Sequence, residues 1–138
     1  IYKASFSGYE KKFENGNWLT RDKEIFNKYK ADPFCQQICS ANFYHSFFKN
    51  MKKIYKKSEL NKVNLSIPIL IISGSSDPVG GFGKLTTKLK KLYDGLGVKN
   101  CGLKLYEGGR HEILNETNRK EVFDYILNFI NSNLTNDK

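Results

Sequence analysis

Apolar residues recur at two different spacings along the chain, and the change of spacing falls near residue 62. Between residues 20 and 57 they recur every three or four positions, which predicts amphipathic helices. From residue 67 onward, short continuous apolar runs alternate with helical patterns, which indicates the order strand–helix–strand–helix. We therefore expect a helical segment over residues 1–62 and an α/β segment over residues 63–138.

The first segment predicts a loop over residues 1–17 and then two helices. One helix begins with Thr20 as its N-cap and ends before Asp32-Pro33, because the residue before a proline disfavours helical backbone. The other runs from about Ser40 to Lys57. Its apolar face consists of Phe43, Tyr44, Phe47, Phe48, Met51, Ile54 and Tyr55. Such a face is typical of a helix–helix core or of a cover over an apolar ligand, and periodicity alone favours the core.

The second segment predicts a parallel βαβ unit followed by a helix. The run at residues 67–72 is apolar at both parities, which suits a strand buried on both faces. A helix over 83–96 and a strand over 103–106 follow. The last helix, 115–134, carries Val122, Phe123, Ile126, Phe129 and Ile130 on one side. Because two strands alone do not make a stable sheet, we expect other strands to pair with them or to have been lost.

Composition and charge narrow the class of protein. With 39% hydrophobic residues, the 138-residue chain is expected to form about one packed domain. The net charge of +9 comes mostly from scattered Lys, and no Arg-rich or aromatic-interleaved stretch indicates nucleic-acid binding. The charge is compatible with a weak attraction to anionic membrane surfaces. Three cysteines without tight spacing argue against a disulfide framework and a metal site, and favour a reducing, cytoplasmic location.

Two polar side chains follow the predicted strands. Asp77 comes after the first strand and His111 after the second. A right-handed crossover between adjacent parallel strands places both loops at one edge, where ligands and reactive groups gather. An Asp that orients a His supplies two members of a serine-hydrolase triad. Each residue also has a plainer interpretation, since Asp77 precedes Pro78 in a turn and His111 can be an exposed loop residue.

A nucleophile is not found in the sequence. No serine stands in the Gly-x-Ser-x-Gly pattern that the strained nucleophile elbow requires. The glycines at 80, 81 and 83 match neither a phosphate loop nor a dinucleotide fingerprint. The sequence therefore implies no cofactor and no metal.

Longer motifs carry a family resemblance. "PILIISGSSDPVGGFGK" and "LYEGGRHEILNETNRKEV" resemble the C-terminal part of monoacylglycerol lipase–like α/β-hydrolases, which are often called lysophospholipases. "NWLTRDKEIFNKYKADPFC" is similar to the cap insertion of the same family. The resemblance runs from about Gly8 to Leu134. It implies the C-terminal portion of an α/β-hydrolase fold, two parallel strands with flanking helices, preceded by a helical cap.

The resemblance also implies an activity, which is hydrolysis of lipid or other carboxylic esters by a Ser-His-Asp triad. Asp77 would be the triad acid and His111 the general base, while cap helices would cover an acyl pocket. The candidate substrate contacts are Phe34, Phe43, Tyr44 and Phe47. With this resemblance, the aromatic face of the second helix is as well interpreted as a cover over a ligand as it is as a helix–helix core. The family's nucleophile elbow, oxyanion loop and first six strands are absent, so these residues alone are expected to be inactive and to need the N-terminal part of the hydrolase.

Other interpretations stay open. One is a non-catalytic remnant that binds a hydrophobic ligand or forms a homo-oligomer through an open sheet edge. Another is acyl transfer to an acceptor other than water, or peptide-bond hydrolysis. Among smaller features, we expect Trp18, Arg21 and Asp22 to dock the cap onto the body. We expect a structural salt bridge from Arg110, a local contact from Glu112, and Glu116 in the first turn of the last helix.

Overall fold

The computed structural model describes residues 8–35 and 37–134, and residues 1–7 of the predicted N-terminal loop lie outside that range. The helices and strands in chain order are η1 (Glu14–Gly16), α2 (Lys23–Ala31), α3 (Ala41–Ile54), α4 (Lys57–Leu60), β1 (Ile69–Gly74), α5 (Lys84–Leu96), β2 (Cys101–Tyr106), η2 (Ile113–Asn115) and α6 (Arg119–Leu134). This is the predicted order, with the two short 3₁₀ helices and the short α4 added, and with helical backbone at residues 8–10 of the predicted loop.

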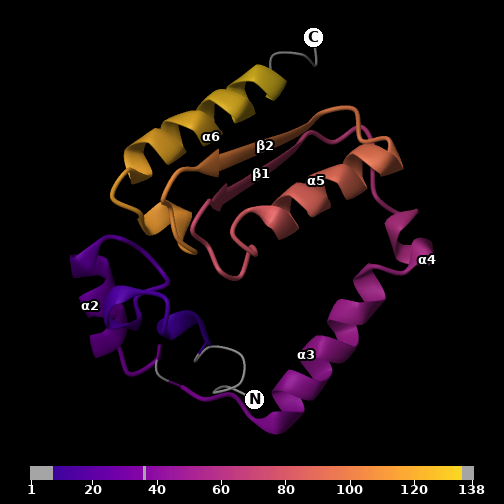
Figure 1. The fold of residues 1–138 in the computed structure, drawn as a ribbon. Helices are drawn as coiled ribbons and strands as arrows, with labels where there is room; N and C mark the ends of the chain where they lie inside the picture. The colour runs from indigo at the N-terminus through magenta and orange to yellow at the C-terminus, as the bar shows by residue number, and fades with distance from the viewer. Residues whose placement is uncertain (1–7, 36, 135–138) are drawn as a thin grey trace.

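The two strands form a parallel pair, as predicted. Their register runs from Ile69 opposite Cys101 to Gly74 opposite Tyr106. Helix α5 connects them and lies on one side of the sheet, while α6 lies on the other, so the C-terminal half has three layers (Figure 1). Within the described residues β1 pairs only with β2, and its burial is accordingly incomplete: Ile69, Leu70 and Ile72 are half-buried rather than buried on both faces.

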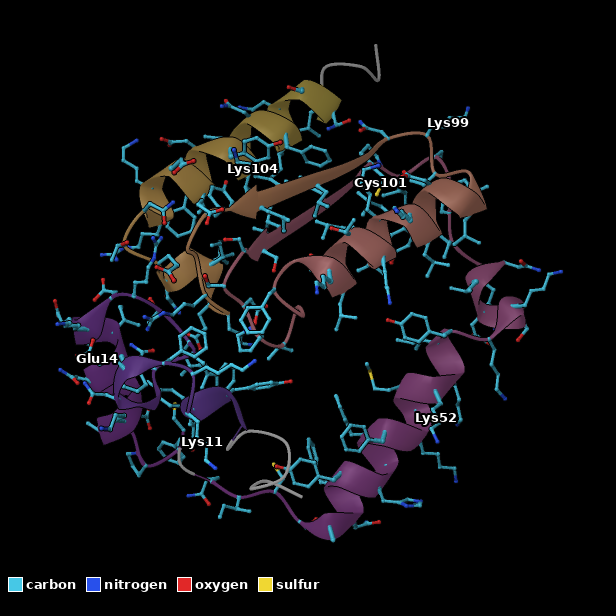
Figure 2. All side chains as sticks on the ribbon, viewed as in Figure 1. Lys11, Glu14, Lys52, Lys99, Cys101 and Lys104 are labelled. Atoms are coloured by element: carbon cyan, nitrogen blue, oxygen red, sulfur yellow. The ribbon has the colours of Figure 1, made fainter. Side chains whose placement is uncertain are left out.

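The core lies between the sheet and α6. It consists of Tyr106, Ile113 and Val122, with Ile72 and Ile126 packed against them. Lys104 reaches between β2 and α6, where its Nζ lies 5.4 Å from the centre of the Tyr106 ring (Figure 2). Ile113 lies two positions after His111 in the chain. Because the Ile113 side chain is buried in this core, it anchors the loop of His111 to the sheet.

Helix α6 has two apolar stripes rather than the single one predicted. Val122, Ile126 and Phe129 are buried or half-buried, whereas Phe123 and Ile130 are exposed. The exposed stripe is Phe123, Leu127, Ile130 and Leu134, with exposures of 46–68%. Residues spaced by four, three and four positions share one helix face, so this stripe is a continuous apolar surface.

The N-terminal helices differ from prediction at their ends. Helix α2 is capped by Asp22, whose carboxylate accepts hydrogen bonds from the Glu24 and Ile25 N–H groups, and not by Thr20. Ser40 caps α3. That helix stops at Ile54, and Lys56 adopts extended backbone before the short α4. Continuing the helix would place like charges at positions 52 and 56, and 53 and 57, which is unfavourable.

The aromatic face of α3 is not a helix–helix core within the described residues. Phe43, Phe47, Phe48, Met51 and Ile54 are 40–51% exposed. Helix α3 lies apart from the sheet, and the Lys52 side chain leaves it on the side away from α5 (Figure 2). The C-terminal end of α3 lies near α5. There Ile54 and Tyr55 line a pocket of about 290 Å³ together with Leu89, Leu92 and Tyr93 of α5.

Candidate active site

The loops that follow β1 and β2 are joined backbone to backbone. Ser75 N–H donates to the Tyr106 carbonyl at 2.9 Å, and Ser76 N–H donates to the Gly109 carbonyl at 2.9 Å. The Ser75 hydroxyl accepts a hydrogen bond from Gly108 N–H. A Cβ placed on Gly74 would lie 2.0 Å from the Gly109 carbonyl oxygen, so only glycine allows this approach. The contact brings residues 77 and 111 to the same edge of the sheet.

Asp77 is a buried carboxylate in the first loop, with 6% of its surface exposed. Its main chain closes the turn, because Asp77 N–H donates to the Gly74 carbonyl and the Asp77 carbonyl accepts from Phe82 N–H. Its Oδ1 accepts a hydrogen bond from Val79 N–H at 2.9 Å. The side chain is thereby fixed, with the same oxygen facing the second loop.

His111 meets that oxygen. Its Nδ1 lies 3.2 Å from Asp77 Oδ1, and its ring lies 5.2 Å from the Trp18 ring, centre to centre. The hydrogen bond to Asp77 raises the pKa of His111 above 6.5, with a further contribution from the Asp77 and Glu112 charges, against the opposing effect of desolvation. With the Asp77 carboxylate as acceptor, Nδ1 carries the proton and Nε2 of the neutral ring is free to accept one.

The main chain around His111 is held by the N-terminal segment. His111 N–H donates to the Trp18 carbonyl at 3.4 Å, and Glu112 N–H donates to the Leu19 carbonyl at 2.8 Å. The Thr20 hydroxyl donates to the Asn115 carbonyl at 2.7 Å. Asp22 pairs with Arg119 of α6 at 2.9 Å. Trp18 and Asp22 therefore contact the C-terminal half, as predicted.

Glu116 is the central polar residue of this region, although the sequence suggested only a residue in the first turn of the last helix. It lies before α6 rather than in its first turn, and its side chain is fully buried. It pairs with Arg21 at 2.8 Å and accepts a further hydrogen bond from Arg110 N–H. The predicted salt bridge of Arg110 is wrong for the described residues, because its guanidinium donates to the Asn17 and Thr20 carbonyls instead. Glu112 makes the expected local contact, with Asn115.

The four predicted substrate contacts lie in two places. Phe43, Tyr44 and Phe47 cluster on α3, where the Phe43 and Phe47 rings stack 6.1 Å apart and the Phe43 and Tyr44 rings meet edge to face at 5.5 Å. Phe34 lies in the turn after α2 and is 85% exposed. The structure thus groups three of the four residues, and their role in substrate binding stays a prediction.

Among residues 8–35 and 37–134, no group of three or more His, Cys, Asp or Glu side chains is arranged to hold a metal ion. In that part of the chain, no helix combines the length and apolar character needed to span a membrane.

Two known proteins resemble the chain, one in sequence and the other in both sequence and fold. A monoacylglycerol lipase of Mycolicibacterium smegmatis is 27% identical over 119 residues, which cover 84% of this chain and 39% of the lipase. A thermostable carboxyl esterase of Bacillus coagulans, solved in complex with glycerol, superposes with a TM-score of 0.82 and 28% identity, covering 95% of this chain and 44% of the esterase. The chain therefore spans about two fifths of the length of these relatives.

The architecture is accordingly that of the C-terminal portion of an α/β-hydrolase, as the motifs indicated. Residues 5–118 match the family described as serine aminopeptidase, S33. A match over most of the chain, together with the two relatives, leads to one conclusion: the chain belongs to this family of α/β-hydrolases and resembles its monoacylglycerol lipases.

Proposed function

We propose that the chain is the cap and C-terminal portion of a serine hydrolase that cleaves lipid or other carboxylic esters. Asp77 is the triad acid and His111 the general base. The observation that carries the proposal is the 3.2 Å contact between His111 Nδ1 and Asp77 Oδ1 at the carboxyl ends of two neighbouring parallel strands. Relatives named as a monoacylglycerol lipase and a carboxyl esterase support ester substrates.

The chemistry requires a serine beside His111 Nε2. As the serine oxygen bonds to the ester carbonyl carbon, Nε2 takes its proton and the Asp77 carboxylate offsets the imidazolium charge. The carbon–oxygen bond to the alcohol then breaks, and the alcohol leaves with that proton. A water activated by the same nitrogen attacks the acyl-serine, which releases the carboxylic acid and regenerates the serine.

The nucleophile in this proposal lies in polypeptide outside these 138 residues. The sequence contains no Gly-x-Ser-x-Gly, and the chain covers only 39% and 44% of its two relatives. Residues 1–62 would form the cap, with Phe43, Tyr44 and Phe47 facing the acyl chain. Without the rest of the hydrolase, the imidazole has no hydroxyl to activate, so the isolated chain is expected to be inactive.

Exchange of the triad acid tests the proposal. In the complete hydrolase, Asp77→Asn should lower kcat/KM for p-nitrophenyl esters by about 10⁴, because an Asn no longer fixes the required tautomer. The matched control is Asp94→Asn, which removes an α5 carboxylate that pairs with Lys90. Equal ester turnover by Asp77→Asn and the control would refute the proposal. Aminoacyl p-nitroanilides, run in parallel, distinguish ester hydrolysis from the peptidase activity in the family's name.

A second candidate is a non-catalytic protein that self-associates. The observation in its favour is the open surface of the C-terminal half: among the described residues β1 has a single strand partner, and the exposed stripe of α6 consists of four large apolar side chains. Contiguous exposed apolar surface of this kind marks interaction sites. Sedimentation velocity of the 138-residue chain tests this candidate, which predicts a concentration-dependent dimer; a monomer at every concentration rules it out.

A further inference from the structure

We propose that Glu116 is a positioning residue for His111. Its buried carboxylate ties the turn that carries His111 to the Arg21 region of the N-terminal segment and so holds the imidazole against Asp77. The catalytic consequence depends on the proposed function, whereas the positioning itself does not.

The Glu116 carboxylate accepts hydrogen bonds from four donor groups of three residues. Oε1 accepts from Arg110 N–H at 2.8 Å and from Arg21 N–H at 3.2 Å. Oε2 accepts from the Arg21 guanidinium Nε at 2.8 Å and from Thr117 N–H at 3.2 Å. The Glu116 side chain has 0% exposure, and a buried charge is tolerated only when it is paired and hydrogen-bonded. The carboxylate therefore depends on both segments at once.

The donors lie beside the groups that fix His111. Arg110 immediately precedes His111, and Arg21 follows Trp18 and Leu19, whose carbonyls accept from His111 and Glu112 N–H. Two side chains cross between the two segments here, namely the Glu116 carboxylate and the Arg110 guanidinium, which donates to the Asn17 and Thr20 carbonyls. Removing the carboxylate leaves the turn held by that guanidinium and by backbone hydrogen bonds of 3.4 Å and 2.8 Å.

The arrangement links the N-terminal segment to the imidazole. Arg21 also donates to the Asn118 side chain at 3.0 Å, just before α6, so the guanidinium holds both Glu116 and Asn118. A displacement of residues 18–22 would move the Glu116 carboxylate and the turn together. The N-terminal segment, which is the predicted cap, is therefore part of the support of His111 as well as a cover.

The test is a pH titration of the two histidine side chains by NMR in the 138-residue chain. His45 lies exposed on α3 and serves as an internal reference. Three groups face the His111 ring, namely the Asp77 carboxylate, the Glu112 carboxylate and the Trp18 ring. In the wild type, His111 should titrate above 6.5, which marks the formed contact with Asp77.

Two conservative variants separate position from charge. Glu116→Gln keeps the shape but loses the charge, while Glu116→Asp keeps the charge but is one methylene too short to reach all four donors. Positioning predicts that both variants move the pKa of His111 toward 6.5. A pure charge effect predicts that Glu116→Asp titrates like the wild type, and that result would overturn the proposal.

A third variant controls for loss of stability. Val98→Ala truncates a buried side chain between α5 and β2, at the opposite end of the strands from His111. It should lower Tm but leave the pKa of His111 unchanged. If the Glu116 variants lower Tm while His111 keeps its wild-type pKa, Glu116 is only structural. If they do not fold, Arg21→Lys, which loses the Nε donor, takes their place with the same expected shift and the same contradicting result.

Discussion

The imidazole of His111 and the carboxylate of Asp77 meet at 3.2 Å although 34 residues separate them in the chain. The contact does not arise from local sequence. It depends on the parallel register of β1 and β2 and on the backbone contact of Gly74 with Gly109, which brings the two loops together.

The close approach of Gly74 to the Gly109 backbone predicts that one methyl group added at position 74 strongly lowers stability. Gly74→Ala should destabilise the chain by at least about 3 kcal/mol, because the new Cβ would overlap the Gly109 backbone. The control is Gly95→Ala in α5, where nothing lies within 4 Å of the added Cβ. That change should be neutral or stabilise by about 0.5–1 kcal/mol. Urea unfolding of both variants checks the contrast; equal stabilities contradict the described loop geometry.

The Asp77–His111 pair predicts a pH-dependent stability. Because folding raises the pKa of His111 above 6.5, the stabilisation is fully present below about pH 6.5 and is lost as pH rises through the folded-state pKa. With 38% of the His111 side chain exposed, the effect should stay below about 1 kcal/mol.

Unfolding free energies measured from pH 5 to 9 test this dependence. The difference between wild type and His111→Gln should be largest at the acid end and should shrink toward pH 9. His45→Gln, the matched substitution at an exposed position of α3, serves as the control. A difference that grows with increasing pH would contradict the pairing with Asp77.

The two stripes of α6 predict opposite responses to truncation. Val122 has 0% exposure, so Val122→Ala should cost about 1–3 kcal/mol through lost burial and a cavity. Leu127 is 55% exposed, and Leu127→Ala should change the stability of this chain by less than about 0.5 kcal/mol. In the complete hydrolase, Leu127→Ala should become destabilising if further polypeptide covers that stripe. Thermal melts of both variants in both contexts decide the point.

Features that depend on neighbouring elements were predictable from the sequence. The apolar run at residues 67–72 and the strand at 103–106 predicted a parallel pair, and that pair brings the loops of Asp77 and His111 to one edge. The small residues at the ends of both strands can also be read from the sequence. Hydrophobic periodicity largely determines the topology of a βαβ unit. The topology then determines which residues face each other at the end of its strands.

Features that depend on a distant partner were not predictable. Glu116 looked like a helix-start residue, because its partner Arg21 is 95 positions away. Thr20 and Asp22 both belong to residue types that favour the N-cap position. Asp22 caps α2, because the Thr20 hydroxyl instead donates a hydrogen bond to the Asn115 carbonyl. The outer stripe of α6 continues the periodic pattern of the inner one, so periodicity cannot tell which stripe the sheet buries.

The central claim is that His111 is the general base of an ester hydrolase, and turnover of a p-nitrophenyl ester by the complete protein tests it most directly. His111→Ala should lower kcat/KM by at least about 10³, while His45→Ala, which removes the exposed histidine of α3, should leave it unchanged. Turnover by His111→Ala equal to that of His45→Ala would contradict the account.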